Sequence, residues 1–349
     1  MTALGDHVSF SVALATYNGE AHLDEQLASI AAQTHRPAEM VVSDDGSTDG
    51  TLSVLRRFAR TAPFPVHVYS NERTLGYRDN FLRAARLTSF PWIAFSDQDD
   101  VWLKGKLEAV RRAIGETPGV SLVTHSADLV DADLNPSGYR LPNYRRARVR
   151  GPLENWPIQV LTGFTLVFDR GLLDGVPAEG RPRDLNDPSH QLAHDQLVPF
   201  LANVFGRTAY LSETLALYRR HESAATGEAG TGAYRTGLRA DAAAHLRTMA
   251  QDYLRQADIV EEHAEFLEVL ASVMRPDKAT LAKRGAAHYR DYAGALAVRA
   301  SVYDKARPRL QRVRAWSALV RAGAYRRLGP GTGLGWKACA KDVALGFLQ

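Results

Sequence analysis

Three carboxylates crowd together in the segment FSDQDDVW, where Asp97, Asp99 and Asp100 directly follow an apolar run. A second acidic segment, SDDGSTDG at residues 43–50, begins at the end of another apolar run. Mg²⁺ and Mn²⁺ prefer oxygen ligands, and they commonly bridge carboxylates to substrate phosphates. A divalent cation would also remove the mutual repulsion of the acidic side chains. The two clusters therefore predict a metal-dependent phosphate site rather than two solvated loops.

The elements that must position these clusters alternate between strand-like and helix-like segments. From the apolar patterns we expect strands at residues 8–15, 40–42, 65–69, 92–95 and 120–124, and helices at 21–33, 51–59, 79–87 and 104–114. This rhythm predicts an α/β fold, with a mostly parallel sheet and helices on both faces. Ligands of such sheets bind beyond the carboxyl ends of the strands. Thr16-Tyr17-Asn18, Asp44-Asp45 and residues 97–100 would all lie there.

The remainder of the chain is less regular at first and then helical. We expect extended segments at 161–168 and 210–218, a turn at 133–138 and a helix at 195–205, followed by long helices at 238–273, 279–304 and 308–327. Between these two parts lies the Gly/Ala/Thr-rich stretch ESAATGEAGTGA. The predicted organisation is a catalytic domain at 1–222, a flexible linker at 223–236 and a helical region at 237–349.

The order of four segments carries a resemblance to a known family. ALATYNGEAHLDEQLASIAAQ, VVSDDGSTDGT, NERTLGYRDNF and FSDQDDVWLKGKL together resemble the inverting family-2 glycosyltransferases, in particular the branch of rhamnosyltransferases in polysaccharide assembly. The likeness covers about residues 8–221. It implies a GT-A nucleotide-diphospho-sugar transferase fold, followed here by an all-helical extension that matches no motif.

The resemblance also assigns donor-binding residues. It implies that Thr16, Tyr17 and Asp44 line the pocket for the base and ribose of a nucleotide-sugar, with Asn18 beside them and Asp45 assisting. A carboxylate can accept the imide N–H of uracil or thymine, which agrees with this assignment.

The acidic cluster and a nearby asparagine complete the implied donor site. In the pair at 97 and 99, Asp99 is expected to ligate Mg²⁺ or Mn²⁺ directly, and Asp97 to contact the ribose or the metal. Asn80 resembles the asparagine that buttresses this site, although it could equally be an ordinary residue at a helix start.

An inverting transfer also needs a general base for the acceptor hydroxyl. Carboxylates that hold a cation suit this task poorly, so we look later in the chain, where HDQL at 194–197 opens a predicted helix. From the tetrapeptide alone Asp195 would be a helix cap, whereas the family pattern makes it the base and lets His194 orient it or touch the acceptor. The helix dipole is expected to lower the pKa of Asp195.

Five further residues are expected near the sugar or the diphosphate. Arg219 and Arg220 suit phosphate oxygens or the sugar pocket, and the resemblance implies that His221 completes the metal site or contacts the diphosphate. Gly163 is expected to let a sugar approach the backbone closely. Trp102 either stacks on a sugar ring or packs under the sheet.

Composition and charge limit the setting and the partners. The start of the chain does not read as a signal peptide, no window is apolar enough to span a membrane, and Cys339 is the single cysteine, which together predict a cytoplasmic protein. Ten Lys or Arg and no Asp or Glu lie between residues 305 and 341. This block predicts peripheral contact with the inner face of the cell membrane. No motif for nucleic-acid recognition accompanies it.

The function predicted from these observations is transfer of a sugar from a nucleotide donor to a glycan or a lipid-linked acceptor. The resemblance favours L-rhamnose from a dTDP donor, with a UDP-sugar as the other choice, and it leaves a homo-oligomer open. Two alternatives are a sugar-1-phosphate nucleotidyltransferase and a non-catalytic scaffold for glycan assembly. The first would carry a glycine-rich loop with Thr-Arg where this chain reads ATYNGE, and the second predicts damaged acidic motifs, which are complete here.

Overall fold

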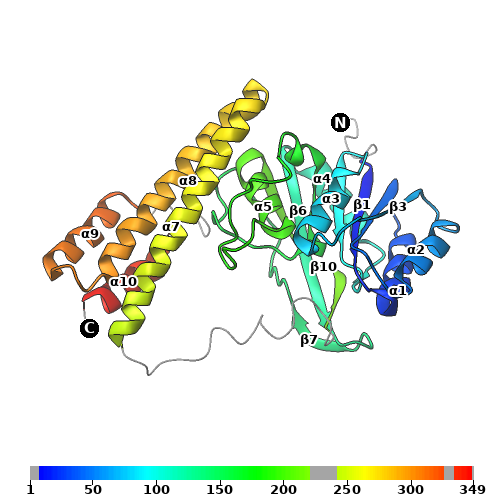
Figure 1. The fold of residues 1–349 in the computed structure, drawn as a ribbon, viewed down its shortest axis with the longest axis horizontal. Helices are drawn as coiled ribbons and strands as arrows, with labels where there is room; N and C mark the ends of the chain where they lie inside the picture. The colour runs from blue at the N-terminus through cyan, green and yellow to red at the C-terminus, as the bar shows by residue number, and fades with distance from the viewer. Residues whose placement is uncertain (1–7, 221–241, 326–333, 348–349) are drawn as a thin grey trace.

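The centre of the protein is a mixed β-sheet (Figure 1). The structure is a computed structural model that describes residues 8–220, 242–325 and 334–347. Within that part the strands are ordered β3 (Val66–Ser70), β2 (Glu39–Asp44), β1 (Phe10–Thr16), β4 (Trp92–Ser96), β9 (Val167–Asp169), β6 (Val120–Val130), β10 (Arg207–Arg219) and β5 (Val101–Trp102). Two more strands lie off this path: β7 (Pro136–Arg140) pairs with β6, and β8 (Arg148–Arg150) pairs with β10.

Strand direction divides the sheet into two halves. The pairs β3–β2, β2–β1 and β1–β4 are parallel, which confirms the prediction for the first half of the chain. In the second half β6 and β10 are parallel, but β9 lies antiparallel between β4 and β6. No α-helix lies between β6 and β9 to return the chain for a parallel strand. The extended segment expected at 161–168 is correspondingly short, because the 3₁₀ turn η1 (Gly163–Thr165) occupies its centre.

Helices cover both faces of the sheet, as the alternating pattern predicted. The helices α1 (Glu20–Ala31), α2 (Thr51–Ala59) and α4 (Lys106–Glu116) pack on one face, and α3 (Tyr77–Arg86) and α5 (His194–Phe205) on the other. Alternate residues of β1 enter the two cores: Val12 and Leu14 join the first, Ala13 and Ala15 the second. A strand buried on both sides reads as a continuous apolar run, which is why β1 was recognisable.

The C-terminal helices pack directly on the sheet domain (Figure 1). The helices α7 (Ala242–Val273) and α8 (Pro276–Tyr303) form a long pair, and their side chains Leu267 and Tyr289 share one core with Phe200 of α5. The helices α9 (Arg309–Arg321) and α10 (Gly335–Phe347) lie at the end of this pair farthest from β1. The sequence pattern did not predict α10. The linker expected at 223–236 lies outside the described residues, so the proposed domain boundaries stay predictions.

One buried carboxylate ties α10 to α8. Asp342 is fully buried and accepts bonds from Nε and a terminal nitrogen of Arg299 at 2.9 and 2.7 Å. The hydroxyls of Tyr303 and Tyr325 donate to its two oxygens, each at 2.6 Å. The buried charge is therefore paired and hydrogen-bonded on both oxygens, which is the arrangement that makes such burial tolerable.

Candidate active site

The end of β2 holds Asp44 in a fixed orientation. Thr16 at the end of β1 donates from Oγ1 to Asp44 Oδ1 at 2.9 Å, and Ser47 donates from its backbone nitrogen to Asp44 Oδ2 at 3.0 Å. The Ser47 hydroxyl adds a third bond at 2.5 Å, and the Asp44 side chain is fully buried. Thr16 and Asp44, expected in one donor pocket, are thus in direct contact.

Asn80 and Asp45 hold the neighbouring loop in place. The Asn80 amide donates to the carbonyl oxygens of Ser43 and Thr16 at 2.9 and 3.3 Å, so it joins the ends of β2 and β1. Asp45 accepts bonds from Leu75 N and Gly76 N at 2.7 and 2.8 Å, which fixes the start of α3. Asn71 Nδ2 bridges the two, since it donates to both Asp45 and Asn80. Asp45 is therefore occupied in supporting the site.

The loop after β1 is bonded to the loops after β2 and β4. Gln98 accepts from Tyr17 N at 2.9 Å and donates to Tyr17 O at 3.0 Å. Asn18, in the left-handed region at φ 47°, donates from its backbone nitrogen to Ser47 Oγ and accepts at Oδ1 from Thr48 N. The ring of Tyr17 is half exposed beside these bonds. Three sequence-distant loops thus form one rim at the carboxyl edge of the sheet.

Arg219 holds the acidic loop in place through hydrogen bonds to Asp99 and Asp100. Its backbone nitrogen donates to Asp100 Oδ1 at 3.2 Å and its Nε donates to Asp99 O at 2.9 Å. The same buried guanidinium donates to Ala132 O and to Glu25. Arg219 is thus engaged by protein groups and not presented to a phosphate. Arg220 pairs by its backbone with β6, and His221 lies outside the described residues.

The carboxylates of the acidic loop are strongly perturbed. Burial, reinforced by the charges of Asp99 and Asp195, raises the pKa of Asp97 to about 8. Burial and the charge of Asp97 also raise the pKa of Asp100 well above its usual range. Asp100 Oδ2 is a buried atom that has no hydrogen-bond partner in the described part of the chain. This concentration of charge is stable only with a compensating cation or with protons.

Lys106 is a buried amine in this site that the sequence did not reveal. Its side chain is fully buried at the start of α4, where Nζ donates to Phe164 O at 2.7 Å and lies 3.7 Å from the centroid of the Trp102 ring. Burial lowers the pKa of Lys106 well below its usual range, while Asp100 and Asp97 oppose that shift. Trp102 is therefore a buried packing partner of Lys106, and the sugar-stacking interpretation was wrong.

The donor set fits a hard divalent cation that also binds phosphate. Asp97, Asp99 and the orphaned oxygen of Asp100 would offer oxygen atoms, which Mg²⁺ and Mn²⁺ prefer as ligands. Within residues 8–220, 242–325 and 334–347, no group of three His, Cys, Asp or Glu is arranged to hold an ion. Mg²⁺ usually takes one or two carboxylates and completes its shell with substrate phosphates and water. A small carboxylate set is what such a shared site requires.

Asp195 lies in the first turn of α5 and is perturbed in the direction that suits a base. Burial, with the nearby charge of Asp184, raises the pKa of Asp195 to about 6. The expectation of a lowered pKa was wrong, because desolvation outweighs the helix end. The N-cap of α5 is Ala193, so Asp195 is not the cap that the tetrapeptide alone suggested. Asp195 is also close enough to contribute to the raised pKa of Asp97.

His194 packs inside the protein next to Gly163. The imidazole stacks on Phe81 at a centroid distance of 3.9 Å and meets the edge of Phe95 at 5.0 Å. Burial lowers the pKa of His194 to about 3, so the ring is neutral. A Cβ atom built on Gly163 would lie 2.4 Å from His194 Nε2. The close approach expected at Gly163 is therefore made by this imidazole and not by a sugar.

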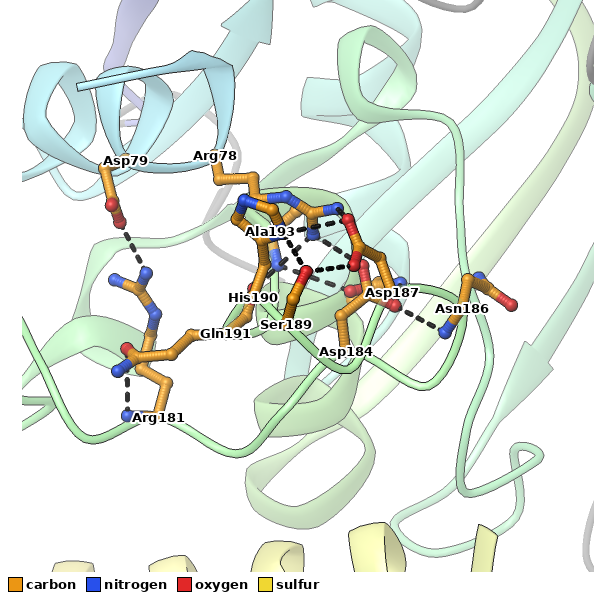
Figure 2. Close-up of polar contacts among 11 residues, drawn as sticks. Arg78, Asp79, Arg181, Asp184, Asn186, Asp187, Ser189, His190, Gln191 and Ala193 are labelled. Carbon is orange, nitrogen blue, oxygen red and sulfur yellow. Dashed lines mark hydrogen bonds and ion pairs between the residues drawn. The ribbon is translucent and has the colours of Figure 1, made fainter. Parts of the chain in front are cut away.

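A polar network holds the loop that precedes α5 (Figure 2). Figure 2 shows Arg78 reaching from α3 to Asp184 and Asp187, while Arg181 pairs with Asp79 of the same helix. Asp184 is buried and also accepts a bond from Gln196 Nε2 at 2.9 Å. The loop, α3 and the start of α5 are thus locked together beside Asp195. Sequence reasoning missed this network, because ion pairs between distant segments leave no local pattern.

Comparison with known proteins agrees with this geometry. Residues 11–176 match the family model described as glycosyl transferase family 2. The chain is similar to the dTDP-rhamnosyl transferase RfbG of Shigella flexneri, with 37% identity over 99 residues, 27% of this chain and 34% of that protein. It is also similar to an uncharacterised glycosyltransferase of Nostoc, with 26% identity over 221 residues, 61% of this chain and 65% of that one. The chain thus spans between a third and two thirds of these relatives.

Solved structures give the same fold. The crystal structure of S. aureus TarS 1-349 in complex with UDP-GlcNAc superposes with a TM-score of 0.53 and 22% identity, covering 92% of this chain and 93% of that chain. At this identity the likeness shows the fold alone. The chain therefore has a GT-A fold followed by a helical region, and its residues 11–176 are a family-2 glycosyltransferase domain.

Proposed function

We propose that the protein is a metal-dependent inverting glycosyltransferase. The observation that carries this proposal is the electrostatic contact across the site: Asp195 on α5 contributes to the raised pKa of Asp97 at the end of β4. The carboxylate proposed to bind the cation and a carboxylate with a pKa of about 6 therefore lie close enough to interact electrostatically. An inverting transfer needs these two functions on opposite sides of the reacting sugar carbon.

In the proposed reaction the rim at the ends of β1 and β2 holds the nucleoside. Thr16, Tyr17, Asn18 and Asp44 orient the base and ribose, and Asp45 and Asn80 keep that rim in place. Asp97 and Asp99, with His221, would hold Mg²⁺ or Mn²⁺ beside the diphosphate. The cation, when bound, stabilises the charge that develops on the leaving nucleoside diphosphate.

Asp195 performs the proton transfer in this proposal. With a pKa of about 6 it is ionised at neutral pH and still basic enough to accept a proton from the acceptor hydroxyl. The acceptor oxygen then forms a bond to the anomeric carbon as the bond to the diphosphate breaks, with inversion of configuration. His194 is buried and neutral, so it positions the start of α5 rather than exchanging protons.

For the donor we propose a nucleoside diphosphate sugar, with dTDP-rhamnose first and a UDP-sugar second. The named activity of the Shigella relative supports the former, and the ligand of the TarS structure supports the latter. The acceptor is a glycan or a lipid-linked glycan.

The helix α9 supports peripheral membrane contact. Leu310, Val313 and Val320 are exposed on it among arginines, and Trp336 of α10 is 73% exposed. No described helix is long and apolar enough to cross a membrane. An exposed surface of arginines and apolar side chains suits an anionic bilayer interface. Co-sedimentation with anionic liposomes should fall when residues 305–349 are removed, and unchanged binding would refute this contact.

The test of the proposed function is the variant Asp195→Asn. Release of nucleoside diphosphate from the donor should fall about a thousandfold, within the range of ~10²–10⁴ for loss of a general base. Donor affinity, measured by calorimetry with Mn²⁺, should stay within twofold. Asp277→Asn, an exposed carboxylate on α8, is the matched control and should behave as wild type. Turnover by Asp195→Asn close to that of the wild type would refute Asp195 as the base.

A further inference from the structure

A small pocket opens beside the proposed base. Its volume is about 60 Å³, and it lies between the segment at 157–160, the loop at 185–186 and the helices α5 and α7. Val160 and Gln196 line it, and the next residue after Val160 is hydrogen-bonded to the residue before Gln196, since Leu161 N donates to Asp195 O at 3.1 Å. Two lining residues of the pocket are therefore close to Asp195: Gln196 follows it directly in the chain, and Val160 precedes the residue that is hydrogen-bonded to it.

The lining of the pocket has polar groups but no formal charge. Its polar members are the amides of Gln159, Asn186 and Gln196 and the imidazole of His263. His263 Nδ1 donates to Ile259 O at 2.7 Å, and burial lowers the pKa of His263 to about 4, so the ring is neutral. Apolar side chains such as Phe200 form the rest. Such a lining suits a neutral ligand with hydroxyl groups and apolar C–H faces.

One hydrogen-bond donor of the pocket has no partner. Gln159 Oε1 accepts a bond from the Tyr210 hydroxyl at 3.2 Å, but Gln159 Nε2 is buried and makes no hydrogen bond within the described residues. A buried amide left unpaired costs about 1–3 kcal/mol. Gln159 lines the pocket, so a ligand hydroxyl or carbonyl oxygen that reached this amide would remove that cost.

An oriented aromatic ring directly precedes the segment that lines the pocket. Trp156 is 52% exposed, yet its Nε1 donates to the Tyr292 hydroxyl of α8 at 2.8 Å. Tyr289 of α8 donates to Pro157 O at 3.0 Å and fixes the backbone of the same segment. Trp156 and Val160 are four residues apart and so lie within about 14 Å of each other. A rigid, half-exposed indole offers a flat apolar surface with little entropy to lose.

We propose that residues 156–160, backed by α7 and α8, form an acceptor subsite for an uncharged oligosaccharide. A hydroxyl-bearing edge of the sugar next to the one that receives the new bond enters the pocket at Gln159, and a further sugar packs on Trp156. The C-terminal helices therefore contribute to acceptor recognition, by holding this segment and by supplying His263. This inference rests on the proposed glycosyltransferase function and adds where, and by what chemistry, the acceptor binds.

The experiment compares transfer with hydrolysis of the donor. Wild-type protein is incubated with Mn²⁺ and either dTDP-rhamnose or UDP-GlcNAc, first without acceptor and then on an array of neutral oligosaccharides and their sulfated counterparts. The best neutral acceptor is then titrated against Trp156→Ala and Gln159→Leu, the second of which keeps the side-chain volume. Val269→Ala, an exposed apolar residue on α7, is the control.

Donor hydrolysis and the acceptor KM should respond differently to the pocket variants. Both pocket variants should keep donor hydrolysis within twofold of the wild type and raise the acceptor KM at least tenfold, while Val269→Ala changes neither. Unchanged acceptor KM in both variants, a preference for sulfated acceptors, or donor hydrolysis without transfer to any neutral oligosaccharide would overturn the subsite. Failure of the wild type to release nucleoside diphosphate from either donor would instead overturn the proposed function, and the subsite with it.

Discussion

Replacing Gly163 by alanine tests how tightly the site is built. The new Cβ would lie 2.4 Å from His194 Nε2, so about 1 Å of movement is needed to reach the 3.4 Å at which ordinary contact begins. The imidazole cannot simply retreat, because it is stacked on Phe81 at 3.9 Å and lies against Phe95. Overpacking of this kind costs about 1–3 kcal/mol of folding free energy.

The movement should be transmitted to the neighbouring Asp195. A displacement of about 1 Å in catalytic geometry costs roughly a hundredfold in rate. We therefore expect Gly163→Ala to lower both the unfolding midpoint in urea and kcat, with kcat about a hundred times smaller. The assays are urea unfolding followed by circular dichroism and release of nucleoside diphosphate from the donor.

Two controls make this prediction specific. Gly294→Ala is the same substitution at an exposed position of α8 where no atom lies within 4 Å of the added Cβ. It should stabilise the protein by up to about 1 kcal/mol. In a His194→Ala background the clash partner is gone, so Gly163→Ala should cost at least about 1 kcal/mol less than in the wild type. Additive costs in this double-mutant cycle would refute the steric reasoning.

Three further predictions follow from the charges. Burial raises the pKa of Asp195 to about 6. The value of kcat should therefore fall tenfold per pH unit below about pH 6 and level off above it. A constant kcat down to pH 4 would exclude Asp195 as the titrating base. Lys106→Met removes the bond to Phe164 O and the amine beside Asp97 and Asp100, so kcat should fall at least tenfold. Lys104→Met, on the exposed surface, should leave kcat unchanged. Asp342→Asn leaves Arg299 inadequately paired and should cost about 3–5 kcal/mol of stability. The exposed pair Asp304–Arg307 is its control, since Asp304→Asn should cost under about 1 kcal/mol; equal urea midpoints for the two variants would contradict this account.

The sequence predicted the fold best where strands are buried on both sides. β1, β2 and β4 are continuous apolar runs that end in polar residues, and α2 was predicted with its observed bounds of Thr51–Ala59. The region between β6 and β9 was harder, since its direction in the sheet depends on pairing rather than on periodicity. α10 was missed because it begins at the end of the glycine-rich run GPGTGLG at 329–335, which favours a turn.

For the candidate site, too, sequence patterns predicted some features and not others. Thr16, Asp44 and Asn80 come from local motifs, and the structure brings them into contact. The environment of each residue could not be inferred, because burial decides it: desolvation raises the pKa of Asp195 against the expected effect of the helix end. Lys106 reads as an ordinary lysine at the start of a helix, and only the three-dimensional structure places it beneath the acidic loop.

The most direct test of the central claim is calorimetric titration of dTDP-rhamnose and UDP-GlcNAc into EDTA-treated protein, with and without added Mn²⁺. The claim is that Asp97 and Asp99 hold a divalent cation against the donor diphosphate. We predict that at least one donor binds only when Mn²⁺ is present, and that Asp99→Ala abolishes this dependence together with most of the affinity. Equal donor affinity without metal, or Mn²⁺-dependent binding that survives in Asp99→Ala, would contradict it.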